Sequence, residues 1–288
     1  MIYFCADDYG ISKESNSRIE KCIQNGVLNK VSVLPNGELE DFKQRLSKYD
    51  VKLSLHINLI EGKPLSPTQD INLLVDDKGN FKYSFIGLLL LSLSPKRKQL
   101  KNQLYKEIKE QIIFWKKNMG ENPLWIDSHQ HTHMIPLVFK TLMKVIKDEN
   151  IEVENIRIPS EPISPYILTP SLYTLYSPSG IIKQWVLKIF GFVNSRKFKR
   201  SNIPTSEFLG VMFSGRVTEE IIDKLLPSYL KIAESRGKDI EITYHPGYLE
   251  KGECLMDGCR DGFKKFYFSP WRKKEYKTLI DYKFKKEG

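Results

Sequence analysis

The chain has 288 residues and a formal net charge of +10, with 41% hydrophobic, 28% charged and 11% aromatic residues. This balance is typical of a folded globular protein, and it excludes disordered, collagen-like and disulfide-scaffold chains. Barrels of alternating strands and helices often reach this length as one unit. We therefore expect a single domain spanning 1–288.

Basic residues concentrate near the C-terminus, where 260–288 contains ten Lys or Arg and four Asp or Glu. No nucleic-acid-binding motif accompanies this basic tail, so we expect a solvated surface and no nucleic acid partner. Four cysteines are too few and too scattered for a disulfide framework. With no secretion signal and no apolar run long enough to cross a bilayer, the sequence predicts a cytoplasmic protein without integral membrane contact.

Short apolar runs alternate with longer amphipathic ones, which is the pattern of parallel strands joined by crossover helices. In chain order, strands are predicted at 2–6, 30–34, 52–56, 124–127, 155–158, 208–212 and 241–244. Helices are predicted at 13–24, 38–47, 96–118, 137–147 and 219–236. Ser12 and Thr218 are expected N-caps, and Gly26 and Gly237 lie where helices should end. The pattern predicts an α/β fold, a TIM-barrel-like (β/α) barrel with seven strands.

Two segments interrupt the alternation. The first, 64–94, is predicted to be a long loop carrying a short apolar piece, and the second, 160–205, is rich in Pro, Ser and Tyr and carries an apolar and basic stretch. Long excursions from a compact barrel usually form lids, binding loops or subunit contacts. We favour a lid or a subunit contact for 160–205 over a membrane-surface contact by 181–193, because that apolar run is short.

All five histidines lie at or just past the ends of predicted strands. They are His56, His129, His131, His133 and His245. The carboxyl ends of parallel strands form one rim of a barrel, and Asp7 and Asp8 follow the first strand at the same rim. Each residue alone has an ordinary explanation as a strand-end or turn residue. Their convergence predicts a metal centre.

The segment 127–133 alternates so that Asp127, His129, His131 and His133 would share one face while the chain stays extended. Imidazoles buried side by side need a metal, a carboxylate or a substrate. A carboxylate with two imidazoles and open positions suits Zn, Mn, Co or Fe better than Ca, and it suits hydrolysis. A neighbouring acid can then take the proton of water, and His245 can protonate a leaving group.

Four separate motifs resemble, in order and spacing, those of the YdjC-like (ChbG/HpnK) carbohydrate deacetylases. They are Ala6-Asp7-Asp8-Tyr9-Gly10, His56-Ile57-Asn58-Leu59, Asp127-Ser128-His129-Gln130-His131-Thr132-His133-Met134 and His245-Pro246-Gly247. The stretches Val33-Leu34-Pro35-Asn36-Gly37 and Gly62-Lys63-Pro64-Leu65 fit as well, so the resemblance spans about 1–250.

The resemblance implies a (β/α) barrel related to the polysaccharide deacetylases that removes acetyl from an N-acetylated amino sugar. It implies one divalent metal ion, Mg²⁺ or Zn²⁺ with Mn²⁺ or Co²⁺ as alternatives, a small-molecule sugar substrate and a homodimer. Carried over by position, Asp8, His56 and His129 look like the metal ligands, Asp7 like the base and His245 like the acid. Tyr9, His131 and His133 would shape the pocket or support the ligands. Arg157 would orient Asp7 or bind substrate, with a structural salt bridge as the alternative.

Other interpretations stay open at this point. His129 and His133 are four residues apart, so they would share a helix face and form a ligand pair of their own. A metal-dependent phosphoesterase or amidohydrolase would place similar residues on the same rim, usually with more carboxylates or a second metal. A non-catalytic carbohydrate or nucleic-acid binder would instead use the basic tail with the aromatic residues Phe266, Tyr267, Phe268 and Trp271.

Overall fold

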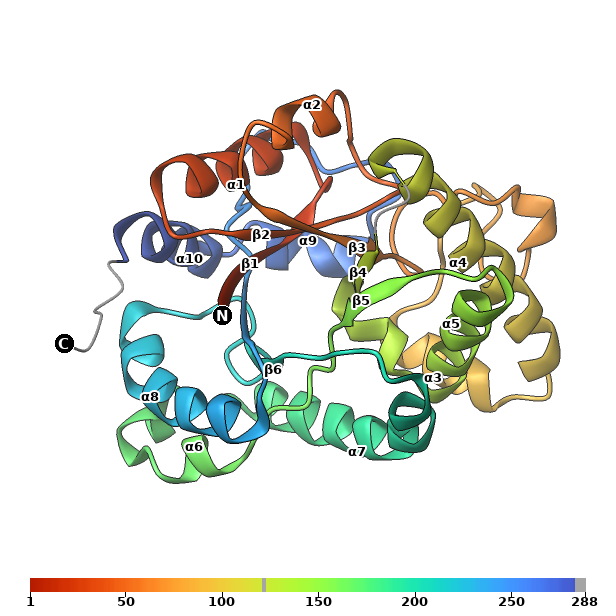
Figure 1. Cartoon of the computed structure of the whole chain (residues 1–288). Coiled ribbons are helices and arrows are strands. Elements are labelled where there is room, and N and C mark those ends of the chain that lie inside the picture. The colour runs from red at the N-terminus through yellow and green to blue at the C-terminus, as the bar shows by residue number, and fades with distance from the viewer. Residues whose placement is uncertain (121–122, 283–288) are drawn as a thin grey trace.

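The computed structural model describes residues 1–120 and 123–282 and contains a sheet of seven parallel strands (Figure 1). The strands are β1 (Ile2–Tyr9), β2 (Lys30–Val33), β3 (Lys52–Ile57), β4 (Leu124–Ser128), β5 (Val153–Ile156), β6 (Glu207–Leu209) and β7 (Ile240–Tyr244). They pair in the order β5-β4-β3-β2-β1-β7-β6. All seven predicted strands are confirmed.

The sheet curls so that its two edge strands approach each other (Figure 1). The Ile156 N–H of β5 donates to the carbonyl oxygen of Pro204 (3.2 Å), which lies just before β6. The Asn155 amide donates to the Ser206 hydroxyl (3.4 Å). These contacts, in place of a strand ladder, bridge β5 and β6. The predicted barrel is therefore confirmed as a curled, seven-stranded half-barrel with helices around it.

The five predicted helices are all present, with ends shifted by a few residues. They are α1 (Lys13–Asn25), α2 (Phe42–Leu46), α4 (Arg97–Met119), α5 (Pro136–Asp148) and α8 (Glu219–Arg236). The Ser12 hydroxyl accepts from the Ser15 N–H and caps α1, whereas the Thr218 side chain makes no capping hydrogen bond. Gly237 ends α8 with a φ of 61°, which a glycine adopts without steric cost.

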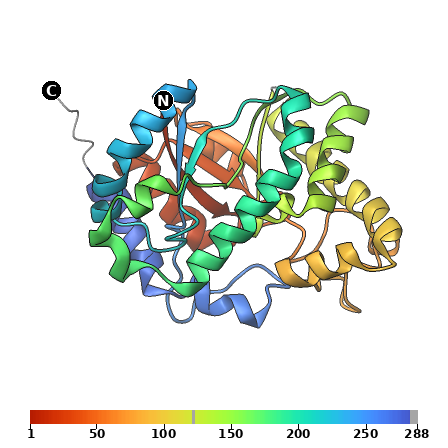
Figure 2. The same cartoon turned by 90° about the horizontal axis from the view of Figure 1, so that it is seen from below.

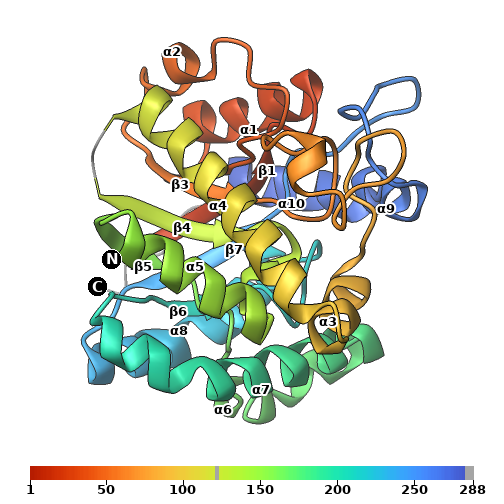
Figure 3. The same cartoon turned by 90° about the vertical axis from the view of Figure 1, so that its right-hand side faces the viewer.

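Additional helices occupy the segments predicted as loops or tail. They are η1 (Thr68–Asp70), α3 (Phe85–Leu93), η2 (His129–Met134), α6 (Ser164–Ile167), η3 (Pro170–Leu175), α7 (Pro178–Ser201), α9 (Asp261–Tyr267) and α10 (Pro270–Asp281). α7 and α8 cover one side of the barrel in Figure 3, and α3 lies at the end of α4. α10 packs against α1, where the Val27 N–H donates to the Leu279 carbonyl (3.0 Å). Residues 283–288 of the predicted basic tail lie outside the described residues.

The core lies between the sheet and its surrounding helices. Strands β2, β4 and β7 are buried along their whole length, and their charged residues are paired inside the barrel, as Lys30 is with Glu241. In the described part of the chain, no helix combines the length and the apolar character needed to cross a membrane.

Candidate active site

A bulge at the end of β1 positions the two consecutive carboxylates. The register of β1 against β2 shifts between Ala6 and Tyr9, and Asp8 adopts a left-handed conformation with a φ of 70°. Side chains of a regular strand alternate between the two faces, and a bulge breaks this alternation. Asp7 and Asp8 are both buried, and both contact charged groups at the carboxyl end of the sheet.

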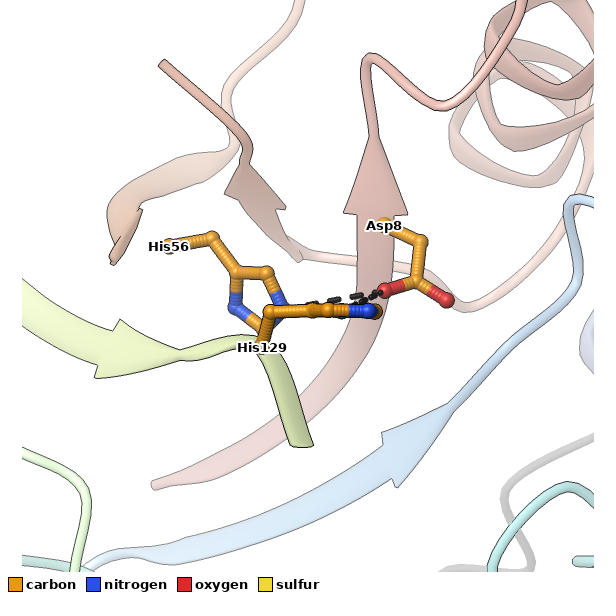
Figure 4. Close-up of side chains that lie close together, drawn as sticks. All are labelled: Asp8, His56 and His129. Atoms are coloured by element: carbon orange, nitrogen blue, oxygen red, sulfur yellow. Dashed lines mark hydrogen bonds and ion pairs between the residues drawn. The ribbon is translucent and has the colours of Figure 1, made fainter. Parts of the chain in front are cut away.

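Asp8, His56 and His129 come together at the carboxyl ends of β1, β3 and β4 (Figure 4). Asp8 Oδ1 lies 2.9 Å from His129 Nδ1 and 3.7 Å from His56 Nε2. One ligand atom from each residue lies within 4.8 Å of the others, and His56 Nε2 is buried without a hydrogen-bond partner. An unpartnered imidazole nitrogen beside a carboxylate and a second imidazole fits a divalent metal ion.

Each of these three side chains is held by a further polar group. Asp127 Oδ1 lies 2.6 Å from His56 Nδ1, which leaves Nε2 of the same ring directed toward Asp8. His129 Nε2 lies 3.6 Å from Glu61 Oε2, and Arg272 pairs with Asp8 Oδ2. A carboxylate on the far nitrogen of a ligating histidine fixes its ring and its tautomer. The surroundings therefore fix the orientation of all three ligand candidates.

The cluster concentrates negative charge around its histidines. Burial opposes protonation of His129, but Asp8 and Glu61 outweigh burial and raise the pKa of His129 to about 10. Burial also disfavours the charged form of Asp8, yet His129, His56 and Arg272 hold its pKa well below the usual range. Carboxylates that stabilise a proton on a buried imidazole stabilise a metal cation in the same way.

A second group of possible ligands, Asp7, His56 and Asp127, is less suited to a metal because a guanidinium already occupies it. Arg157 donates from Nη1 to Asp7 Oδ2 (2.7 Å) and from Nη2 to Asp7 Oδ1 (2.8 Å). The same Nη2 lies 3.1 Å from Asp127 Oδ2. Burial would raise the pKa of Asp7, but Arg157 outweighs burial and lowers this pKa to about 2. Asp7 is thus a fixed, ionised carboxylate beside the cluster.

Arg157 is itself part of a buried ion network behind the site. Its Nε donates to Glu241 Oε1 (2.7 Å), and Lys30 Nζ lies 2.9 Å from the same oxygen. Charges buried this completely are tolerated only when they are paired. Arg157 thus contacts Asp7 and also makes a structural ion pair with Glu241, so both roles considered for it stay predictions.

His245 follows β7 on the same rim. Its backbone N–H donates to Glu275 Oε2 (2.6 Å), and its ring packs edge-on against Phe266 with centroids 5.3 Å apart. Glu275 Oε1 accepts from the Val217 N–H (2.8 Å), so this carboxylate ties two loops together. The Nδ1 atom of His245 is buried without a hydrogen-bond partner. It lies 3.8 Å from Glu275 Oε2, so the carboxylate that fixes the loop also faces the imidazole.

The histidines of the third motif, 127–134, do not share one face. The chain leaves the extended conformation after Ser128, because Gln130 (φ 50°) and His131 (φ 56°) turn it into η2. His133 contacts the Ser128 hydroxyl (2.5 Å) and the Arg157 carbonyl (2.8 Å), whereas His129 contacts Asp8. The extended alternation and the His129–His133 ligand pair are both wrong, because the left-handed turn rotates the two rings apart.

His131 and Tyr9 lie away from the three ligand candidates. His131 packs edge-on against Phe208, and burial together with Arg157 holds its pKa well below the usual range. The Tyr9 hydroxyl donates to Glu20 of α1 (2.7 Å), on the helix side of β1. Tyr9 therefore anchors α1 against the strand and is not placed to line a pocket beside Asp8.

Several contacts in and around the cluster come from residues that the sequence did not single out. They are Lys30, Glu61, Glu241, Arg272 and Glu275. Tyr267, named above only for a non-catalytic binder, donates its hydroxyl to Glu61 (2.9 Å). Arg272 and Glu275 lie in the predicted basic tail, where one buried arginine cannot be distinguished from its exposed neighbours by composition. Glu61 lies between two motifs of the resemblance, and that position is the only signal that points to it.

The fold and the site define a curled (β/α) barrel with a carboxylate and two histidines at its carboxyl rim. The family model described as YdjC-like protein matches residues 1–287. The chain therefore belongs to the YdjC-like family, and the predicted family is confirmed.

Individual relatives agree with this assignment. A carbohydrate deacetylase of Clostridium beijerinckii is 30% identical over 189 residues, which cover 64% of this chain and 72% of the relative. A carbohydrate deacetylase of Thermoanaerobacter pseudethanolicus is 30% identical over 193 residues, which cover 65% and 73%. A crystal structure from Enterococcus faecalis, named for cellobiose-phosphate cleavage, is similar with a TM-score of 0.64 at 19% identity, over 97% of this chain and 93% of that one. This last similarity supports the fold.

Proposed function

We propose that this chain is a metal-dependent hydrolase that removes acetyl from an N-acetylated amino sugar. The observation that carries the proposal is the buried cluster of Asp8, His56 and His129 with the fixed carboxylate of Asp7 beside it. The two relatives named carbohydrate deacetylases support the choice of reaction. A small sugar would be the substrate, and 1–288 would act as one catalytic domain.

The ion would be held by Asp8 Oδ1, His56 Nε2 and His129 Nδ1, because these three atoms face one another. The remaining oxygen of Asp8 is bound by Arg272, and the remaining nitrogen of His56 is bound by Asp127. Among the divalent ions expected for the family, two imidazoles and one carboxylate favour Zn²⁺, Mn²⁺ or Co²⁺ over Mg²⁺. When bound, such an ion polarises a carbonyl group and lowers the pKa of water.

Asp7 would accept the proton of the attacking water. Arg157 holds both oxygens of Asp7, so the carboxylate is ionised at neutral pH and cannot rotate away. His245 would donate a proton to the departing amine from Nε2, because Glu275 fixes its loop and faces the Nδ1 side of the ring at 3.8 Å. An acid and a base held on one rim match the requirements of amide hydrolysis.

Acetate release from a panel of N-acetylated sugars tests this proposal, with protein reconstituted in turn with Zn²⁺, Mn²⁺, Co²⁺ and Mg²⁺. Asp7→Asn should lower kcat by about 10²–10⁴-fold, the usual contribution of a general base. Glu40→Gln, at an exposed ion pair with Lys13, is the matched control and should leave the rate unchanged. Acetate release that survives Asp7→Asn, or phosphate release from sugar phosphates in its place, would contradict the proposal.

A further inference from the structure

Helix α7 carries a stripe of apolar side chains on the outside of the molecule. Ile182, Trp185, Ile189 and Phe192 recur at intervals of three and four residues and form one stripe. Phe192 is 82% exposed and Trp185 is 53% exposed. The buried residues of the same helix are Gly180, Gln184, Leu187 and Asn194, and two of them are amides. Leu187, Phe190 and Phe198 pack inward against the core, so the outer stripe is a second apolar side of the helix, where a surface helix usually carries polar residues.

Specific contacts on the inner side hold α7 in this orientation. The Gln184 amide donates to the Glu161 carbonyl (3.0 Å), and the Asn194 amide donates to the Met134 carbonyl (2.9 Å). At Gly180, a Cβ atom would lie 2.4 Å from the Met212 carbonyl oxygen, so the helix can approach that closely only with a glycine. Rotating the helix to bury its stripe would break these contacts. The exposed stripe is thus built into the fold.

Helix α3 extends the apolar surface beside α7. Phe85 of α3 stacks on Phe190 of α7 with ring centroids 6.3 Å apart. Ile86, Leu90 and Leu93 of α3 are 62–72% exposed. Figure 2 shows both helices on the side of the molecule that faces the viewer. Apolar groups gathered on one face in this way mark an interaction surface more often than scattered ones do.

The charges around this face have a single sign. α7 contains six Lys or Arg, namely Lys183, Lys188, Arg196, Lys197, Lys199 and Arg200, and no Asp or Glu. Lys188 donates inward to the Glu161 carbonyl (3.4 Å) and does not count toward the outer face. Lys96, Arg97 and Lys98 follow α3 and are exposed. A two-fold contact with a second copy would bring the same cationic helix against itself, with no acidic partner on that helix. A negatively charged surface complements it instead.

We propose that the outer face of α7 and α3 docks onto the surface of an anionic lipid bilayer. Apolar side chains with Lys and Arg beside them are what a helix needs to lie in the headgroup region of a membrane. The contact is peripheral, because no described helix is suited to crossing a membrane. From the sequence, a lid or a subunit contact is favoured for 160–205 because the apolar run 181–193 is short. In the structure α3 lies beside that run and enlarges the apolar surface, so the membrane surface is favoured instead.

The docking face lies next to the rim that carries the active site. Glu161 follows β5, and its carboxylate accepts from the N–H groups of Gly210, Val211 and Met212, which follow β6. α7 is anchored to the same two loops through Gln184 and Gly180. A bilayer bound to α7 would therefore lie beside the carboxyl rim of the barrel.

Co-sedimentation of the full chain with vesicles tests the proposal and does not depend on its catalytic reaction. Vesicles of equal parts phosphatidylcholine and phosphatidylglycerol should bind the protein, and vesicles of phosphatidylcholine alone should not. Arg196→Gln and Lys199→Gln should each weaken partitioning about fivefold, corresponding to about 1 kcal/mol per charge at an anionic surface. Phe192→Ala should weaken it about tenfold, because a buried aromatic side chain is lost from the lipid.

Matched controls lie on other helices. Ile113→Ala removes an exposed apolar side chain of α4, and Lys231→Gln removes an exposed charge of α8, so both should bind like the wild type. Circular dichroism and light scattering accompany each variant. Absence of binding to anionic vesicles, or equal loss in the control variants, would overturn the proposal. A dimer that Phe192→Ala dissociates, without any vesicle binding, would overturn it in favour of a second copy.

Discussion

Substituting Arg157 by lysine separates the positive charge at this position from the shape of the guanidinium group. Arg157 binds both oxygens of Asp7 and one oxygen of Glu241 with three N–H donors at 2.7–2.8 Å. A lysine keeps the charge, but its single nitrogen cannot reach both carboxylates in this geometry. We expect one of the three contacts to survive.

The cost follows from the two contacts that are lost. Each charge-assisted hydrogen bond contributes about 1.5–3 kcal/mol, so Arg157→Lys should lower the free energy of unfolding by about 3–6 kcal/mol. Lys30 also pairs with Glu241 and relieves part of that loss, which favours the lower end. With Asp7 held by one bond in place of two, kcat for acetate release should fall about 100-fold, as expected for a displacement of about 1 Å.

Urea unfolding gives the free energy, and acetate release gives the rate. Arg236→Lys is the control, because Arg236 pairs with Glu207 at 3.0 Å with a side chain that is 53% exposed. Glu207 is buried but also pairs with Lys238 at 3.3 Å, so it stays neutralised and this variant should lose only about 0–1 kcal/mol. If Arg157→Lys and Arg236→Lys unfolded alike and both retained full activity, the assignment of Arg157 as the residue that positions Asp7 would be refuted.

Three further predictions test other parts of the account. His245→Gln should lower kcat by about 10²–10⁴-fold while metal content stays unchanged, since His245 is expected to donate a proton and not to bind the ion; metal loss on quantitative analysis would contradict this. Burial raises the pKa of Glu161 to about 7 although three backbone N–H groups oppose the shift. The folded state therefore holds this proton more tightly than the unfolded state, and stability should fall by about 3 kcal/mol as pH rises from about 4.5 to 7. The difference in unfolding free energy between the wild type and Glu161→Gln should change by about 3 kcal/mol between about pH 4.5 and 7. A difference that stays constant over this pH range would exclude a raised pKa of Glu161. Gly180→Ala should destabilise the protein by about 1–3 kcal/mol, because the new Cβ would meet the Met212 carbonyl oxygen. Gly262→Ala, in open space on α9, should stabilise the protein slightly. Thermal unfolding distinguishes the two variants.

Residues whose role depends on local pattern were predictable. The strands appear as short apolar runs because the barrel buries them on both faces, and His56, His129 and His245 share a rim because parallel strands end together. Ser12 caps α1 as its residue type indicates. In each of these cases the neighbouring sequence determines the structure.

Residues whose role depends on distant contacts were not predictable. Arg272 meets Asp8 across 264 positions of sequence, and nothing distinguishes it from the exposed lysines beside it. The turn at Gln130 and His131 requires two left-handed residues, which alternation alone does not reveal. α7 has apolar side chains on both sides, with Leu187 and Phe190 inward and Phe192 outward, so no single apolar stripe identified it as a helix of the wall.

The central claim is that Asp8 binds a metal ion while its neighbour Asp7 does not. Native mass spectrometry of Co²⁺-reconstituted protein tests it with two adjacent, isosteric substitutions. We predict one ion per chain in the wild type and in Asp7→Asn, and none in Asp8→Asn, because Asp8 faces His56 and His129 while Arg157 occupies Asp7. An ion retained by Asp8→Asn, or lost from Asp7→Asn, would contradict the account.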